Sequence, residues 1–152
     1  MIQQPQDRTY TANHSTIRLQ YNPQFARLRQ ADIDKAQKFI DSECIRQMQP
    51  YIPRLNGVLA RSATLSTRIG SGVIEYNVPY ARYQYYGKLM VSSITGSAYS
   101  KGEKKILTDV DLKYTKTNPK AGAYWFERMK TDKKSSILRG AAAVIQIRGD
   151  SG

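Results

Sequence analysis

The spacing of hydrophobic residues predicts a strand and a long helix at the start of the chain. Apolar and polar residues alternate over residues 15–21, as in a half-buried strand. Asn22 and Pro23 follow, a helix-start signal with Asn as N-cap and Pro at the first helical position. The helix is expected to end near Gln49, ahead of Pro50. Its core-facing stripe, at three- and four-residue spacing, would be Ile33, Ala36, Ile40, Cys44 and Met48.

The middle of the chain has the pattern of a β-hairpin and a short helix. Residues 65–69 and 74–78 alternate, and a glycine-rich turn at residues 70–72 joins them, which predicts a hairpin. Pro79 can open a short helix and Gly87 can close it.

The second half of the chain is predicted to hold an extended insert and a last helix. Residues 88–117 lack a helical period, and Val91 and residues 107–114 are strand-like. Asn118 and Pro119 repeat the helix-start signal. The helix after them carries Trp125 and Phe126, with a polar interruption at residues 132–135 that could bend it.

These elements predict one α+β domain over residues 15–146. We expect a small antiparallel sheet with a β-hairpin, packed against the long N-terminal helix and the C-terminal helix. Residues 1–14, rich in Gln, Thr and Asn, are expected to form a flexible arm, and residues 147–152 a tail. The longest apolar run, residues 140–145, is too short to cross a bilayer, so we expect no membrane association.

The formal net charge is +12, and it is concentrated in the second half of the chain. Residues 82–148 hold 14 basic and 5 acidic residues, whereas residues 1–81 hold 10 basic and 6 acidic ones. A basic half attracts polyanions through counterion release. A solvated surface on an oligomeric protein explains the same charge equally well, so charge alone does not choose a partner.

Catalytic patterns are missing from the sequence. Cys44 and His14 are the single cysteine and the single histidine, so cysteine–histidine metal clusters and disulfides within one chain are not expected. Cys44 lies on the predicted apolar stripe and is expected to be a core residue. Walker loops and HExxH motifs do not occur. We therefore expect no enzyme activity, no cofactor and no metal.

Eleven tyrosines are present, and four of them cluster around the predicted short helix at Tyr80, Tyr83, Tyr85 and Tyr86. Tyrosine is enriched at protein interfaces because its ring is apolar while its hydroxyl stays wet. Some of these rings are expected to dock the short helix on the hairpin, and the others to form an interface. Stacking on nucleic-acid bases is a more distant alternative.

Three segments together resemble the minor capsid or head–tail joining (neck) proteins of tailed bacteriophages. Residues 50–62, PYIPRLNGVLARS, resemble a Tyr-Val-Pro step followed by a Thr-Gly-x-Leu-x-x-Ser turn, with Asn56 in place of the threonine. Residues 78–88, VPYARYQYYGK, and residues 118–128, NPKAGAYWFER, resemble the family's Pro-Tyr-Ala…Gly stretch and the start of its last helix. A histidine frequent in the second stretch is replaced here by Tyr85 or Tyr86.

The resemblance implies a structural virion protein that forms a homo-oligomeric ring between head and tail, around the DNA channel. Its expected partners are other copies of the chain and neighbouring connector, head-closure and tail-terminator proteins. Non-specific contact with genomic DNA is expected if the basic insert faces the channel. Candidate assembly residues are Tyr83, Tyr85, Tyr86, Lys101, Lys104 and Lys105. Candidate fold-motif residues are Pro53, Gly57, Pro79, Gly87, Trp125 and Phe126.

Two alternatives stay open at this point. Within the same class, the chain could form a tail-terminator or tail-completion ring. From another class, it could be a small basic nucleic-acid-binding protein, although no helix-turn-helix pattern is evident.

Overall fold

The computed structural model describes residues 1–54, 56–114 and 118–146. The expected C-terminal tail, residues 147–152, lies outside the described residues. The elements in chain order are β1 (Arg8–Ala12), β2 (Ser15–Leu19), α1 (Phe25–Met48), the 3-10 helix η1 (Gln49–Tyr51), α2 (Val58–Ser66), α3 (Ala81–Tyr86), β3 (Lys88–Ser92), β4 (Lys105–Asp111) and α4 (Trp125–Gln146). The prediction of one α+β domain with long N-terminal and C-terminal helices is confirmed.

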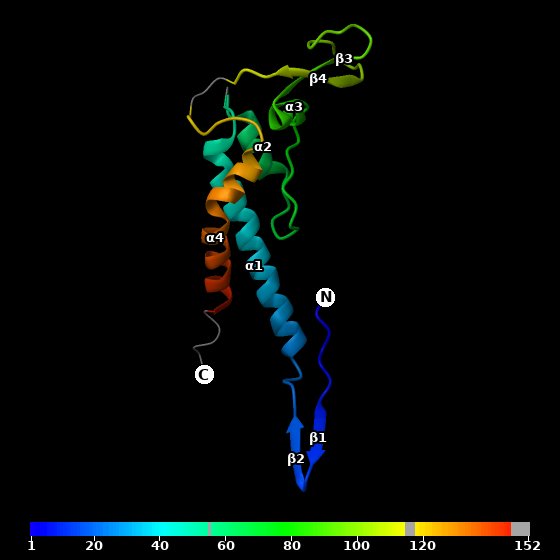
Figure 1. The fold of residues 1–152 in the computed structure, drawn as a ribbon, viewed down its shortest axis with the longest axis vertical. Coiled ribbons are helices and arrows are strands. Elements are labelled where there is room, and N and C mark those ends of the chain that lie inside the picture. Colours follow the sequence, from blue (N-terminus) through cyan, green and yellow to red (C-terminus); the bar gives the residue numbers. More distant parts are fainter. Residues whose placement is uncertain (55, 115–117, 147–152) are drawn as a thin grey trace.

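The core lies between the second half of α1 and the antiparallel helix α4, beneath α2 and α3 (Figure 1). Its fully buried members are Met48, Ile52, Trp125 and Met129, each about 1% exposed. Gly140 of α4 packs against the ring of Phe39, which shows how closely the two helices approach. The polar residues 132–135 do not break α4, which is continuous.

The predicted apolar stripe of α1 faces the core only in the second half of the helix. Met48 is buried, and Ile40 and Cys44 pack partly against the core. Ile33 is 50% exposed and Leu28 is 39% exposed, and the first turns of α1 extend beyond the end of α4 (Figure 1).

The prediction of a hairpin over residues 65–78 is wrong. Residues 58–66 form α2, whose buried residues are Leu59, Ala60, Ser62 and Ala63. These positions follow a helical period that overrides the short alternation beginning at Leu65, which is 85% exposed. Residues 73–78 alternate between exposed and half-buried side chains as expected, but they pair with no strand in the described chain.

Both predicted helix starts are early by a few residues. The Asn22 side chain accepts a hydrogen bond from the backbone N–H of Gln24 (2.8 Å), and α1 begins at Phe25. The Asn118 side chain likewise accepts from the N–H of Lys120 (2.9 Å). Tyr124 has φ +50°, a left-handed conformation that delays α4 to the next residue.

Two antiparallel hairpins lie at opposite ends of the molecule (Figure 1). One pairs β1, within the segment expected to be an arm, with β2, and all ten of their residues are exposed. The other pairs β3 with β4 inside the predicted insert, where the sequence indicated strand-like stretches.

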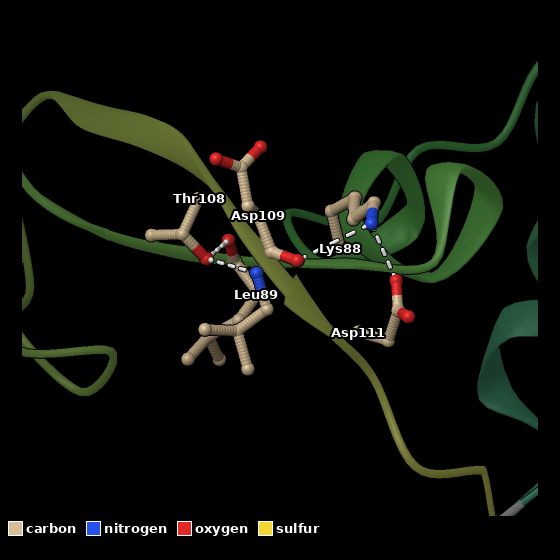
Figure 2. A network of polar contacts seen from close by, with 6 residues as sticks. Lys88, Leu89, Thr108, Asp109 and Asp111 are labelled. Carbon is tan, nitrogen blue, oxygen red and sulfur yellow. Dashed lines mark hydrogen bonds and ion pairs between the residues drawn. The ribbon is translucent and has the colours of Figure 1, made fainter.

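The β3–β4 pairing is irregular between Lys88 and Met90, opposite residues 108–110. Figure 2 shows how polar groups fill this irregularity. The Thr108 hydroxyl donates to the carbonyl of Leu89 (2.8 Å), and the Lys88 ammonium contacts the Asp111 carboxylate (2.5 Å). Asp111 is largely exposed, so the ion pair contributes little stability, and the hydroxyl contact defines the bulge.

Candidate assembly site

The first and third motif segments meet at Tyr51. Its carbonyl accepts hydrogen bonds from the backbone N–H of Gly122 (3.1 Å) and the Arg128 guanidinium (3.4 Å). Arg128 and the Lys120 ammonium lie 5.7 and 5.3 Å from the centre of the Tyr51 ring. The Tyr51 hydroxyl donates to the Asp132 carboxylate (2.5 Å), and this bond raises the pKa of the phenol. The contacts tie α4 to the end of α1.

The second and third segments meet at the C-terminus of α3. The N–H of Tyr124 donates to the carbonyl of Tyr85 (2.8 Å), and the N–H of Leu112 donates to that of Gly87 (2.9 Å). Gly87 has φ +69°, and a Cβ there would lie 2.9 Å from the Cβ of Ala123. Both the turn and the close approach therefore require glycine at this position.

An aromatic cluster fills the space between these segments. The ring of Trp125 lies 4.8 Å from Tyr85 and 5.5 Å from Tyr76, both edge to face. Tyr124 extends the cluster to Tyr86, which is 43% exposed. Burial raises the pKa of Tyr76 to about 12, so its phenol stays neutral. The cluster therefore runs from the core to the surface.

The candidate assembly tyrosines have different surroundings. Tyr85 contacts Trp125 and acts in the core, whereas Tyr86 faces solvent. Tyr83 is half-buried, with the Lys105 ammonium 5.6 Å from its ring centre. Lys101 and Lys104 are exposed. The structure thus brings Tyr83 and Lys105 together, packs Tyr86 on Tyr85 and Tyr124 with part of its ring exposed, and leaves Lys101 and Lys104 exposed.

The tip of the β3–β4 hairpin is held by its own hydrogen bonds. The Ser92 and Thr95 hydroxyls both donate to the Glu103 carboxylate. The bond from Ser92 is the main reason that the pKa of Glu103 lies below its ordinary value. The Lys105 ammonium donates to the carbonyl of Ala98 (2.6 Å). Lys105 therefore stabilises the tip.

The fold-motif residues are spread across the junction. Pro53 is buried, and Gly57 has φ +76° where it precedes α2. Pro79 is exposed, directly before the turn into α3. Phe126 is half-buried, with the Lys130 ammonium 5.8 Å from its ring centre.

An apolar groove of about 590 Å³ runs beside this junction, between α1, residues 72–76, α3 and the start of α4. Ile40, Cys44, Val73 and Tyr86 are among its lining residues. Burial raises the pKa of the Cys44 thiol, which disfavours the reactive thiolate. The described chain contains no cluster of three or more acidic, histidine or cysteine side chains that could hold a metal ion.

Comparison with known proteins decides the family. The family model described as "Minor capsid protein" matches residues 17–143, most of the chain. The chain belongs to the phage minor capsid protein family. It is therefore a structural component of a phage particle. None of the curated proteins and none of the solved structures with which it was compared matches it.

The match to the minor capsid family covers all three motif segments, the whole of α1 and most of α4. The three segments converge on one junction in the fold, so their residues act mainly in holding α4 and the β3–β4 hairpin on the core. No helix in the described part of this minor capsid protein is both long and apolar enough to cross a membrane.

Sequence reasoning missed Asp41, a buried carboxylate on α1. It accepts hydrogen bonds from the backbone N–H groups of Gly70 (2.7 Å) and Gly72 (3.1 Å) and from the Gln37 amide (2.7 Å). The sequence held a signal for this role, because Asp41 lies between Ile40 and Cys44 on the predicted core side of the helix. A buried carboxylate requires hydrogen-bond partners. Asp41 fixes the start of residues 73–78 against α1.

Proposed function

We propose that this minor capsid protein is a head–tail joining subunit that works as a ring of identical copies around the DNA channel. Apolar side chains exposed at both ends of the molecule are the observation that supports this function. Tyr10 (54% exposed) and Ile17 (69%) lie on the β1–β2 hairpin, and Ile94 (80%) and Tyr99 (92%) lie on the β3–β4 tip. Apolar groups gathered in this way are typical of surfaces covered in an assembly.

The resemblance to neck proteins supports a position at the head–tail junction, and the exposed apolar ends support self-association. We expect neighbouring connector, head-closure and tail-terminator proteins to contact the ring along its axis. A tail-terminator ring would use the same surfaces at a different axial level.

The first prediction is that each particle carries several copies of the chain at one axial level. Quantitative mass spectrometry of purified virions, with the major capsid protein as internal standard, measures the copy number. Electron microscopy of the head–tail junction locates the copies. One copy per virion would contradict a ring.

A small basic nucleic-acid-binding protein is the alternative from another class. It predicts tight, sequence-selective binding of a DNA duplex by the free chain, measured by titration over a range of salt concentrations. Equal binding of unrelated sequences, lost as salt rises, would argue against that alternative.

The second prediction concerns Lys101 and Lys104, which are exposed on the β3–β4 tip. If the tip contacts a neighbouring ring or subunit, Lys101→Ser with Lys104→Ser should give heads that fill with DNA but lose their tails or leak genomes. Lys105 is left intact because it supports the tip. Lys35→Ser with Lys134→Ser, at exposed positions on α1 and α4, removes the same charge elsewhere.

Complete particles with altered DNA retention or ejection would instead place these lysines at the channel, where phosphates are contacted without base readout. Unaltered particles would indicate that the two lysines are solvated surface charges without a partner. Electron micrographs and packaged-DNA assays of the two double variants distinguish these outcomes.

A further inference from the structure

The β1–β2 hairpin has one apolar face that nothing in its own chain buries. Tyr10 pairs with Ile17, and Leu19 (43% exposed) lies on the same face. The opposite face carries threonines and Arg18. A two-stranded hairpin is at best marginally stable in water when nothing packs against it. Its apolar face therefore favours a partner.

Residues 73–78 are the complementary feature, a strand-like segment without a neighbouring strand. Side chains alternate along it, with Ile74, Tyr76 and Val78 packed against the core and the residues between them exposed. Among the described residues, the backbone N–H groups of Ile74 and Tyr76, on one edge of the segment, have no hydrogen-bond partner, whereas the N–H of Glu75, on the other edge, donates to the Thr67 hydroxyl (3.0 Å). Free backbone groups of this kind accept an added strand.

Apolar surface borders the same segment on both sides. Val73 is 55% exposed at the edge of the groove beside α1. Leu65 of α2 is 85% exposed and borders hollows on the other side, next to Asn77. An added hairpin would gain backbone hydrogen bonds and apolar contacts at once.

The hairpin does not reach this segment of its own chain. Gly70 and Gly72 lie against Lys38 and Gln37 of α1, about 20 Å along the helix from Phe25. The hairpin points away from the body beyond the start of α1 (Figure 1). Its base is tied to that helix start, since the Gln4 side chain accepts from the N–H of Ala26 (3.1 Å).

We propose that the β1–β2 hairpin of one copy adds to residues 73–78 of the next copy, an inference that rests on the proposed ring. The charges agree, because the hairpin strands carry Arg8 and Arg18 without an acid, whereas residues 73–78 carry Glu75 without a base. The two contacting surfaces differ, so each subunit uses one surface toward each neighbour. Contacts of this heterologous kind generate a closed ring when the rotation between neighbouring subunits closes, and a filament when it does not.

Disulfide crosslinking of the full chain in assembled particles tests the pairing. In a Cys44→Ser background, Asn77→Cys is combined in turn with Thr9→Cys, Thr11→Cys, Thr16→Cys or Arg18→Cys. At least one combination should give a ladder of covalent oligomers on oxidation. Ser135→Cys with Asn77→Cys is the matched control, because Ser135 is exposed on α4, and should give no ladder.

Particles with several copies of the chain but no ladder from any of the four combinations would overturn the pairing and leave the ring in place. A crosslink from the hairpin to a different virion protein would also overturn it. One copy per virion would instead contradict the proposed ring itself.

A second variant separates assembly from folding. Tyr10→Ser with Ile17→Ser should reduce incorporation of the chain into particles by about tenfold or more, because the hairpin loses its apolar face. The urea midpoint of the purified chain should not change, since both side chains are exposed. Unchanged incorporation would contradict the proposal.

Discussion

Replacing Trp125 by alanine should lower the free energy of unfolding by about 3–5 kcal/mol, the usual cost of emptying a large aromatic core site. The side chain is 1% exposed, and its ring contacts Tyr76 and Tyr85. It also begins α4, so its loss would loosen the contact between that helix and residues 73–78. Urea unfolding followed by circular dichroism measures the change.

Tyr99→Ala provides the control for removing an aromatic ring. Tyr99 is 92% exposed, so this change should stay within about 0.5 kcal/mol of the parent. A loss of less than about 1 kcal/mol for Trp125→Ala would show that the tryptophan does not anchor α4.

The second large effect is expected from Gly140→Ala in α4. A Cβ at this position would lie 2.5 Å from the Cζ atom of Phe39, well inside van der Waals contact. Overpacking of this kind costs about 1–3 kcal/mol. In an open helix the same change would be stabilising by about 1 kcal/mol. We therefore expect a net loss of stability, although the intrinsic helix preference favours alanine.

A double-mutant cycle with Phe39→Leu isolates the contact. The smaller side chain should remove most of the penalty of Gly140→Ala, giving a favourable coupling energy in urea unfolding. Ala142→Gly in the same helix is exposed and should lose only the propensity difference of about 1 kcal/mol. Higher stability for Gly140→Ala alone would contradict close packing of α1 and α4.

Long periodic segments could be predicted from the sequence, because their patterns continue over many turns. The ends of α1 and α4 were less predictable, since Asn22 and Asn118 form short turns that precede the helices. Residues 65–78 were misassigned because alternation over a few residues is weak evidence beside the helical burial of residues 59–63. Alternation over residues 74–78 did predict their burial, but the strand expected beside them begins inside α2, and Thr67 contacts them through its side chain, which accepts from the N–H of Glu75 (3.0 Å), rather than through a backbone ladder.

The candidate site was predictable in its parts and not in its arrangement. The three motif segments contain Tyr51, Gly87 and Trp125, and the fold brings them to one junction. Tyr85 and Tyr86 are adjacent in sequence, yet one packs on Trp125 and the other faces solvent. The direction of each side chain depends on the turn at Gly87 and on tertiary packing, which local residue patterns do not contain.

The length of α1 beyond the core has a mechanical consequence. Phe39 packs against Gly140, and α4 continues to Gln146, about 9 Å further, so about 12 Å of α1 from Phe25 projects beyond the supporting helix. A bend of about 10° over this length, gentler than the kinks above about 20° that need a proline or a bulge, would displace the start of α1 by about 2 Å and the hairpin beyond it by more. In an assembly built from this chain, elastic bending would therefore occur mainly in the start of α1 and the hairpin beyond it, while each core moves as a rigid block.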